Sequence, residues 1–251
     1  MIYLVEHFFS IQGEGRYLGT PSIFLRFGGC NMKCVGFGSK VKAPDGKEVI
    51  GCDTAYAVFK NEFLSTWQSI TSVQTLIDIV EGYDLNYLPD IVLTGGEPLI
   101  YANDELFVTF LEYLAKKSHR ITFETNGAID VNFEKYPVYK SAVFALSVKL
   151  SSSGEPKEKR INSKALSNII ENAQDSFYKF TVSAKGIKSS HDEITEITSV
   201  HPKRDIYCMP LSDSKQSIEQ GCESVIEFCK TEGYIYSDRL HIRIWDQIQG
   251  V

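Results

Sequence analysis

The sequence predicts an α/β fold whose parallel sheet forms an incomplete TIM-type barrel of about six βα units. Two observations carry this prediction. Strand-like apolar runs alternate with helical runs along most of the chain, and the strand-like runs are apolar almost throughout. Strands of this kind are buried on both faces, which is typical of a parallel sheet covered by helices. About six such units fit into 251 residues, fewer than the eight of a closed barrel.

The individual elements follow from apolar periodicity. Strands are expected at 22–29, 90–96, 119–127 (strand and turn), 142–149, 177–183, 205–210 and finally 239–245. Helices are expected at 72–83, 104–117, 163–173, about 190–199 and 214–233. Segment 151–163 is the most loop-like, and no low-complexity linker divides the chain. We therefore expect a single domain, 1–251, with an insertion at about 35–51.

Charge and hydropathy exclude some classes of protein. The net charge is −6 and the pI about 5.5, which disfavours a broad nucleic-acid surface and direct nucleic-acid binding. No apolar run approaches the roughly 18–20 residues that cross a bilayer, so no membrane span is expected. The first fifteen residues lack the pattern of a signal peptide. These features predict a cytoplasmic protein, in which clustered cysteines bind metal or do chemistry more often than they form disulfides.

Three cysteines near the N-terminus, Cys30, Cys34 and Cys52, form the most informative cluster. A closed structural zinc site takes four ligands. Three thiolates can instead hold three irons of a four-iron cluster and leave the fourth iron open. Two alternatives remain at this point: incidental core cysteines, or a zinc-stabilised binding module with Cys208 or a histidine as fourth ligand. The segment between Cys34 and Cys52 is expected to be a hairpin or bulging loop with Asp45-Gly46 at its turn.

Polar and glycine motifs come directly after several predicted strands. TGGEP occupies 94–98, ETNG occupies 124–127, Ser147 and Lys149 end another strand, and Met209-Pro210 end a later one. Since the carboxyl ends of parallel strands share one edge of the sheet, we expect these motifs to gather at one ligand site. The adjacent glycines would let a ligand approach the backbone closely.

The N-terminal motif FFSIQGEG, residues 8–15, sets Gln12 and Glu14 beside glycines. Their donors and acceptors suit the edge of a planar, amide-bearing heterocycle, although a surface turn would also use these residues. Arg26 lies in an apolar strand and requires an anionic partner, either a protein acid such as Glu14 or a substrate carboxylate. Oxygen atoms at Asp53-Thr54 beside such a carboxylate would suit Mg²⁺.

These motifs together resemble the radical S-adenosylmethionine (SAM) superfamily: GCNMKC after a strand, then CDT, TGGEP and ETNG. The opening FSIQGEG with GTPSIFLRFGGCN is similar to the 7-carboxy-7-deazaguanine synthase family. The match covers about residues 8–149 and continues weakly through YKFTV (178–182) and CMP (208–210) to the C-terminus.

The resemblance implies a radical SAM core and a lyase of queuosine biosynthesis, a tRNA modification pathway. The reaction would convert 6-carboxy-5,6,7,8-tetrahydropterin to 7-carboxy-7-deazaguanine with loss of ammonia. The cofactors would be a 4Fe-4S cluster, SAM that is regenerated, and Mg²⁺. The family also implies a homodimer and a flavodoxin-like electron donor. The competing enzyme class is an activating enzyme for a glycyl-radical partner, which uses the same cluster but does not need the QGEG motif or Arg26.

The resemblance also assigns roles to individual residues. Cys30, Cys34 and Cys52 would bind the 4Fe-4S cluster, and Thr54 would bind Mg²⁺. The SAM-binding residues would be Gly96, Glu97, Ser147, Val148, Lys149, Met209, Pro210, Leu211 and Ser212. The substrate-binding residues would be Ile11, Gln12, Gly13, Glu14, Arg26, Thr94 and Val251.

The chain departs from the superfamily pattern at two places. The usual spacing is C-x3-C-x2-C, whereas 17 residues separate Cys34 from Cys52 here, and Phe37 stands where the third cysteine normally falls. We assign Cys52 as the third ligand because it carries the CDT sequence that normally ends the motif. Val148 stands where relatives often have proline between the serine and the lysine, which predicts a different backbone shape there.

Overall fold

One nine-stranded sheet forms the centre of the described chain. The computed structural model describes residues 1–202, 204–248 and 250. Seven strands of the sheet are mutually parallel: β2 (Pro21–Phe27), β6 (Asp90–Gly95), β7 (Ile121–Thr125), β8 (Val143–Leu146), β9 (Asp175–Val182), β10 (Ile206–Pro210) and β11 (Ile235–Tyr236). From β7 to β11 each strand lies next to its predecessor in the sequence, and β6 lies next to β2, so the carboxyl ends of the seven strands follow one another along one edge. The α/β class with a mostly parallel sheet is thereby confirmed.

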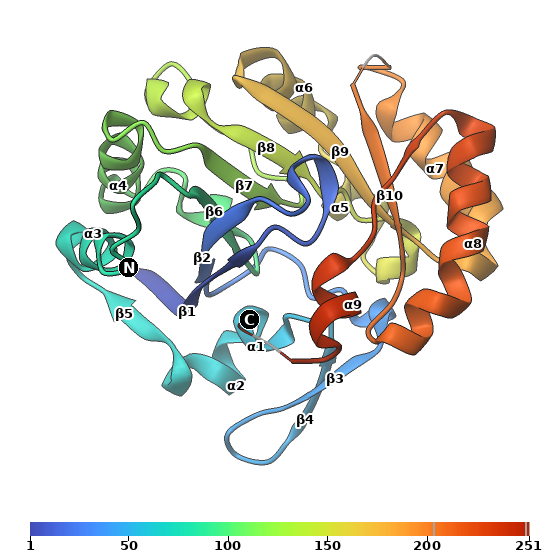
Figure 1. Ribbon diagram of the computed structural model, residues 1–251, viewed down its shortest axis with the longest axis horizontal. Helices are drawn as coiled ribbons and strands as arrows, with labels where there is room; N and C mark the ends of the chain where they lie inside the picture. Colours follow the sequence, from blue (N-terminus) through green and yellow to red (C-terminus); the bar gives the residue numbers. More distant parts are fainter. Residues whose placement is uncertain (203, 249, 251) are drawn as a thin grey trace.

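Antiparallel strands extend the sheet beyond β2. The strand β1 (Ile2–Ile11) pairs with β2, and β5 (Gln68–Ile70) pairs with β1 at the sheet margin. Figure 1 shows the longer helices around the outside of the strands. They are α3 (Val73–Glu81), α4 (Glu105–Lys116), α6 (Ser163–Asn172), α7 (Ile187–Thr198) and α8 (Lys215–Glu232). Three short helices, α1 (Ala55–Val58), α2 (Lys60–Phe63) and α5 (Lys157–Arg160), lie in the connections.

Side-chain caps explain where several helices begin. Asp104 accepts a hydrogen bond from the Leu106 N–H at 3.0 Å and starts α4, and Ser72 accepts from the Gln74 N–H at 3.2 Å to start α3. Ser214 and Ser217 form a reciprocal capping box at the start of α8. Such caps satisfy N–H groups that have no partner within the helix.

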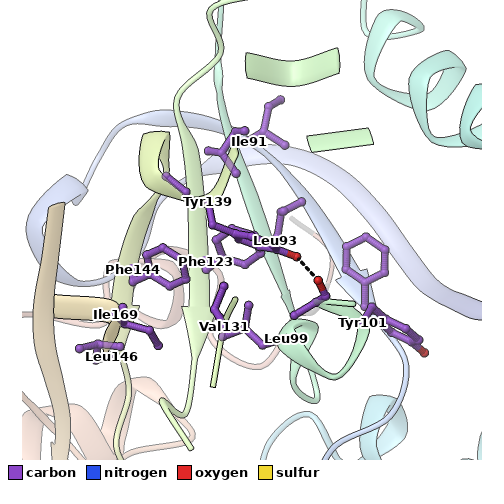
Figure 2. Packing of buried hydrophobic residues seen from close by; sticks show 14 of the residues in the cluster. Ile91, Leu93, Leu99, Tyr101, Phe123, Val131, Tyr139, Phe144, Leu146 and Ile169 are labelled. Atoms are coloured by element: carbon purple, nitrogen blue, oxygen red, sulfur yellow. Dashed lines mark hydrogen bonds between the residues drawn. The ribbon is translucent and has the colours of Figure 1, made fainter. Parts of the chain in front are cut away.

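Aromatic and aliphatic side chains pack together in the core beside the central strands (Figure 2). Phe123 on β7 and Phe144 on β8 are fully buried and stack with ring centroids 5.0 Å apart. Tyr139 packs beside Phe123, and its hydroxyl donates to the Ala102 carbonyl oxygen at 3.0 Å. Burying each such side chain contributes about 1.5–3 kcal/mol, so this core holds the strand ends at fixed positions.

The segment between Cys34 and Cys52 is a hairpin, which is one of the two forms that the sequence predicted. Strand β3 (Ser39–Lys42) pairs with β4 (Glu48–Gly51) in a separate two-stranded sheet. Gly46 adopts a φ of +87°, and its N–H donates to the Ala43 carbonyl oxygen at 2.9 Å. The predicted Asp45-Gly46 turn therefore lies at the tip, where a left-handed residue is required.

The prediction of a last strand at 239–245 is wrong. These residues form α9 (Leu240–Trp245), and the last strand is β11, just before it. The alternation of Leu240, Ile242 and Ile244 suggested a strand, but Ile242 is buried whereas Ile244 is 46% exposed. One buried apolar position per turn satisfies a short helix, which the Asp246 N–H closes by donating to the Ile242 carbonyl oxygen at 2.8 Å.

Two further segments differ from expectation. The N-terminal strand β1 was not predicted, because its polar and apolar residues do not alternate cleanly. Segment 151–163, expected as a loop, contains the 3₁₀ turn η6 (Ser151–Ser153), all of α5 and the first residue of α6, and its Ser153 and Arg160 are buried. Within the described residues, no helix is long and apolar enough to cross a membrane.

Candidate active site at the carboxyl ends of the parallel strands

The three cysteines lie on the wall of one cavity of about 400 Å³. Cys30 follows β2, Cys34 precedes the 3₁₀ turn η2 (Val35–Phe37), and Cys52 follows β4. No three His, Cys, Asp or Glu side chains among the described residues converge on a position for a single metal ion. The three cysteines thus border one shared space at the ends of β2 and β4.

The hairpin brings Cys52 back to the first two cysteines. In the β3–β4 ladder Ser39 lies opposite Gly51, so residues 40–50 project away and the path from Cys34 to Cys52 is short in space. Gly51 is packed closely: a Cβ there would lie 3.1 Å from the Lys33 carbonyl oxygen and 2.9 Å from the Phe59 ring. The long spacing in the sequence is thus compatible with one centre.

Burial governs the protonation of the three thiols. Burial raises the pKa of Cys30 and of Cys52 above the usual thiol value, and it raises the pKa of Cys34 to about 11. Metal ligation requires the thiolate, and a nearby cation lowers a thiol pKa. Soft thiolates in a buried setting suit an iron–sulfur cluster, whose positive irons would stabilise the ionised form. The donor set therefore fits the cluster that the sequence predicted.

Glycines of TGGEP lie against the loop that carries the first cysteine. Gly95 has a φ of +138°, and the Gly96 N–H donates to the Phe27 carbonyl oxygen at 3.1 Å. A Cβ at Gly96 would lie 2.3 Å from the Gly29 carbonyl oxygen and 2.9 Å from the Cβ of Cys30. Only glycine fits this approach, which brings the ends of β2 and β6 to one wall.

Glu97 ties neighbouring strand ends together. Its buried carboxylate accepts from the Thr125 hydroxyl at 2.8 Å, the Asn126 N–H at 2.7 Å and the Leu99 N–H at 3.0 Å. The Asn126 amide in turn donates to the Asn31 side-chain oxygen at 2.7 Å. These bonds lock TGGEP, ETNG and the cysteine loop into one rigid unit.

The structure brings five of the nine predicted SAM residues to the cavity of the cysteines. They are Gly96, Ser147, Lys149, Leu211 and Ser212. Glu97, Val148, Met209 and Pro210 are buried behind the wall and do not line the cavity. Val148 packs in the hydrophobic core, whereas its neighbours Ser147 and Lys149 line the cavity.

A second cavity of about 530 Å³ adjoins the first and contains the predicted substrate residues. It is lined by Ile11, Gln12, Gly13, Glu14, Arg26 and Thr94. Val251, the remaining predicted contact, lies outside the described residues. Thr54, the predicted Mg²⁺ ligand, lines both cavities, and its hydroxyl lies 3.4 Å from the Cys52 sulfur.

Arg26 has a protein partner other than the suggested Glu14. Its Nε donates to Glu6 at 2.7 Å, and the Tyr56 hydroxyl donates to the same carboxylate oxygen at 2.9 Å. Glu6 lies directly opposite Arg26 in the β1–β2 register, so the pair belongs to the sheet itself. Burial opposes the charge of Arg26, but Tyr56 and Glu6 outweigh it and raise its pKa. Arg26 thus presents a fixed cation to both cavities.

Comparison with known proteins places these features in a family. A family model described as a 4Fe-4S single cluster domain matches residues 11–170. The 7-carboxy-7-deazaguanine synthase of Clostridium acetobutylicum is 34% identical over 83% of this chain and 80% of its own length. The chain belongs to the 7-carboxy-7-deazaguanine synthase family. A second member, from Rhodopirellula baltica, is 28% identical over 99% of this chain and 88% of its own.

Solved structures support the fold that this family membership implies. The crystal structure of QueE from Escherichia coli aligns with a TM-score of 0.63 and 22% identity, covering 96% of this chain and 94% of that one. Streptococcus suis SuiB bound to S-adenosylmethionine aligns with a TM-score of 0.52 and 12% identity, over 74% of this chain and 47% of SuiB. At these identities the likeness concerns the fold.

In this member of the 7-carboxy-7-deazaguanine synthase family, a buried ionic cluster that the sequence did not reveal separates the two cavities. Lys179 on β9 contacts Glu14 at 3.0 Å and also Glu124. Arg239, just before α9, donates to Glu14 at 2.8 Å and to Asp53 at 3.0 Å. The cluster joins elements that lie up to 225 residues apart in the chain.

The two carboxylates in contact with Lys179 respond to it differently. Burial alone would raise the pKa of Glu14, but the charges of Lys179 and Arg239 outweigh burial and hold it well below its usual value. At Glu124 burial dominates and raises the pKa. One signal was available in the sequence: Lys179 is the only charged residue in the otherwise apolar run FYKFTV at 177–182. A lone lysine in a buried strand requires an acidic partner.

Proposed function

We propose that this chain is a radical SAM lyase that converts 6-carboxy-5,6,7,8-tetrahydropterin to 7-carboxy-7-deazaguanine with loss of ammonia, within queuosine biosynthesis. One observation carries the proposal: a cavity lined by three cysteines adjoins a second cavity lined by Gln12, Glu14 and Arg26 in a chain of this family. The first cavity suits a cluster with SAM, and the second suits a small anionic heterocycle.

The cavity lined by the three cysteines, which we call the inner cavity, would hold the cofactors. Cys30, Cys34 and Cys52 would bind three irons and leave one iron facing the cavity, where Gly96 and Ser147 leave room for SAM. The Lys149 ammonium donates to the Ser147 hydroxyl at 3.0 Å and places a cation on this wall. When bound, the reduced cluster and SAM supply a carbon-centred radical that removes a hydrogen atom from the substrate.

The second cavity, which is lined by Ile11, Gln12 and Gly13 and which we call the outer cavity, would hold the pterin. Arg26 is a cation for the substrate carboxylate, and Gln12 and the backbone around Gly13 offer donors and acceptors to the edge of the ring. Thr54 would bind a Mg²⁺ ion that also contacts the substrate carboxylate. We retain Val251 as a proposed substrate contact from the C-terminus.

The wall that the two cavities share is important for the proposed reaction. Hydrogen abstraction requires the two reacting carbons in near contact, which two adjoining cavities can provide. At this boundary Lys179 and Arg239 outweigh burial and hold the pKa of Glu14 well below its usual value, whereas burial raises the pKa of Glu124. The chain thus holds one charged and one more basic carboxylate beside the reacting groups.

Several wider features complete the proposal. We propose that the sheet is an incomplete barrel, because its parallel strands follow the order of the sequence without doubling back. We further propose one domain carrying the hairpin insertion at about 35–51. A cytoplasmic homodimer that receives electrons from a flavodoxin-like protein follows from the family resemblance.

One anaerobic experiment tests this function. The chain, with iron and sulfide reconstituted, is incubated with the carboxytetrahydropterin, SAM, Mg²⁺ and a reductant, and 7-carboxy-7-deazaguanine is measured by mass spectrometry. We expect product from the wild type and from Cys222→Ala, whose side chain lies on α8 away from both cavities. Cys52→Ala should lose both the cluster and the product.

Two outcomes would contradict the proposal. A reconstituted cluster without deazaguanine product would favour another radical SAM reaction, such as glycyl-radical activation. A colourless protein that holds one zinc per chain after reconstitution would exclude the cluster itself. Retention of a full cluster by Cys52→Ala would refute the assignment of the third ligand.

A further inference from the structure

A carboxylate far along the chain holds the backbone of the cysteine loop. Glu155 accepts hydrogen bonds from the backbone N–H groups of Cys34, at 3.0 Å, and of Lys33, with the same side-chain oxygen. Its other oxygen contacts the Lys159 ammonium at 2.8 Å, and its side chain is 8% exposed. The hydrogen bonds that two backbone N–H groups donate to one ionised, mostly buried carboxylate oxygen are charge-assisted. Such bonds are shorter and stronger than neutral ones.

These bonds act where the loop is conformationally unfavourable. Cys34 adopts φ 48° and ψ 46°, the left-handed region that a residue with a Cβ seldom occupies. Without an external constraint this residue would relax toward more common angles and turn its side chain away. The hydrogen bond that the Cys34 N–H donates to Glu155 fixes the residue whose sulfur must face the cavity.

A second contact between the same two segments supports this role. Gly36 lies so close to η6 that a Cβ there would be 2.4 Å from the Ser152 carbonyl oxygen and 2.6 Å from the Gly154 nitrogen. We call residues 151–160, which carry Glu155, the platform. Arg160 anchors it by donating to the Lys149 carbonyl oxygen at 3.0 Å and to Glu193 at 2.7 Å.

The three cysteines differ in how they are held. Cys30 lies between the end of β2 and the closely packed Gly96, and Cys52 lies between β4 and α1. Cys34 lies at the start of the insertion, and the platform contacts the backbone at and next to this residue directly. Its position therefore depends on contacts made across space by the platform.

We propose that Glu155 is a positioning residue for the iron–sulfur centre, holding Cys34 ready to bind iron. This inference rests on the proposed function, since it presupposes the cluster. It assigns to the platform a task that no sequence motif indicated. Groups that orient metal ligands typically change metal affinity 10–100-fold when they are mutated.

The test compares three variants of the reconstituted, full-length chain. Glu155→Ala removes the acceptor, whereas Glu155→Gln keeps a side-chain oxygen in the same place. Glu196→Gln is the control, because it removes only the exposed contact between Glu196 and Lys157 on the outer side of the platform. Each protein is analysed for iron and sulfide and for the rate at which an added chelator removes iron, with thermal unfolding of the apo form as a check on folding.

We expect Glu155→Ala to release iron about 10–100 times faster than the wild type, as for loss of other groups that orient metal ligands. Glu155→Gln should restore most of the retention, and Glu196→Gln should match the wild type. Wild-type release rates in Glu155→Ala would overturn the inference. Release of iron from Glu155→Gln and Glu196→Gln as fast as from Glu155→Ala would also overturn it, because the platform would then act only through general stability. A wild type that takes up no cluster would instead refute the proposed function.

Discussion

The two adjoining cavities are built by different means. The inner cavity takes its shape from backbone: glycine turns at strand ends and a cysteine loop held by hydrogen bonds to main-chain N–H groups. The outer cavity takes its character from charge: Lys179 lines this cavity alone, and Arg26, Glu14 and Arg239 lie on the boundary that it shares with the inner cavity. A substitution that adds bulk should therefore damage the inner cavity, and a substitution that removes a charge should damage the outer cavity.

The boundary between the cavities combines both kinds of construction. The residues that line both are Glu14, Arg26, Ser39, Asp53, Thr54, Thr94, Glu124, Ser212, Asp213 and Arg239. This wall receives contributions from the N-terminal motif, the insertion and the residues after it, the ends of four strands (β2, β6, β7 and β10) and the segment before α9. Substrate and SAM would meet here, so the boundary must keep its shape while carrying several buried charges.

Loss of Arg239 should produce the largest change in stability. Its guanidinium contacts Glu14, Asp53 and the Ser212 carbonyl oxygen, and its side chain is 11% exposed. Removing one partner of a buried ion pair costs about 3–5 kcal/mol. We expect Arg239→Met to lose about 3 kcal/mol of unfolding free energy in urea titrations, the lower end of that range, because Lys179 still contacts Glu14.

Arg243, four residues further along the chain on α9, provides the matched control. It pairs with Asp238, but its side chain is 35% exposed, and pairs in such positions contribute about 0–1 kcal/mol. Arg243→Met should therefore lose at most about 1 kcal/mol. Equal losses in both variants would show that α9 is held by packing and that the ionic cluster does not stabilise the boundary.

A methyl group at Gly96 tests the steric side of the comparison. Gly96→Ala would press a Cβ against the Gly29 carbonyl oxygen and Cys30, at a cost of about 1–3 kcal/mol. Gly221→Ala on α8 is the control: its Cβ would meet only Pro210 at an ordinary 3.6 Å, so helix propensity should give a gain of about 0.5–1 kcal/mol. The same urea titrations measure both. A gain in Gly96→Ala would show that the strand ends can separate without cost.

The same division explains what the sequence could predict. The inner cavity was predictable because cysteines, glycines and strand ends are local features, and the order of parallel strands places them at one edge. The outer cavity depends on pairs made across space. Glu6 was missed as the partner of Arg26 because β1 was not predicted, and only its register with β2 brings the two opposite each other.

The missed helix had a similar effect on Arg239. With 239–245 interpreted as a strand, no reason existed to place Arg239 beside Glu14 and Asp53. A short helix and a strand share the same apolar residues when the segment is brief, so periodicity could not separate them. Lys179 carried the one usable signal, a lone charge in a buried strand, but nothing local identified its partners.

Titration of Glu14 and Glu124 gives the subtlest test, because two carboxylates of one cluster should act in opposite directions. The folded state lowers the pKa of Glu14 below its usual value of 4.5, chiefly through Lys179 and Arg239 against the opposing effect of burial. Glu14 therefore stabilises the fold above about pH 4.5, and this contribution is lost as the pH falls through the lowered pKa. Burial raises the pKa of Glu124, so its ionisation costs stability as the pH rises through that pKa, and acidification relieves the cost.

Substitution of each carboxylate by its amide should separate these effects. In Glu14→Gln the unfolding free energy should fall less steeply than in the wild type between pH 7 and pH 3, because the stabilising ionised form is gone. In Glu124→Gln it should fall more steeply, because the compensating gain on protonation is gone. Urea titrations at a series of pH values measure both slopes. Slopes that change in the same direction would mean that the two carboxylates titrate as one unit around Lys179, and the boundary would then depend on the total charge of the cluster and not on the position of each group.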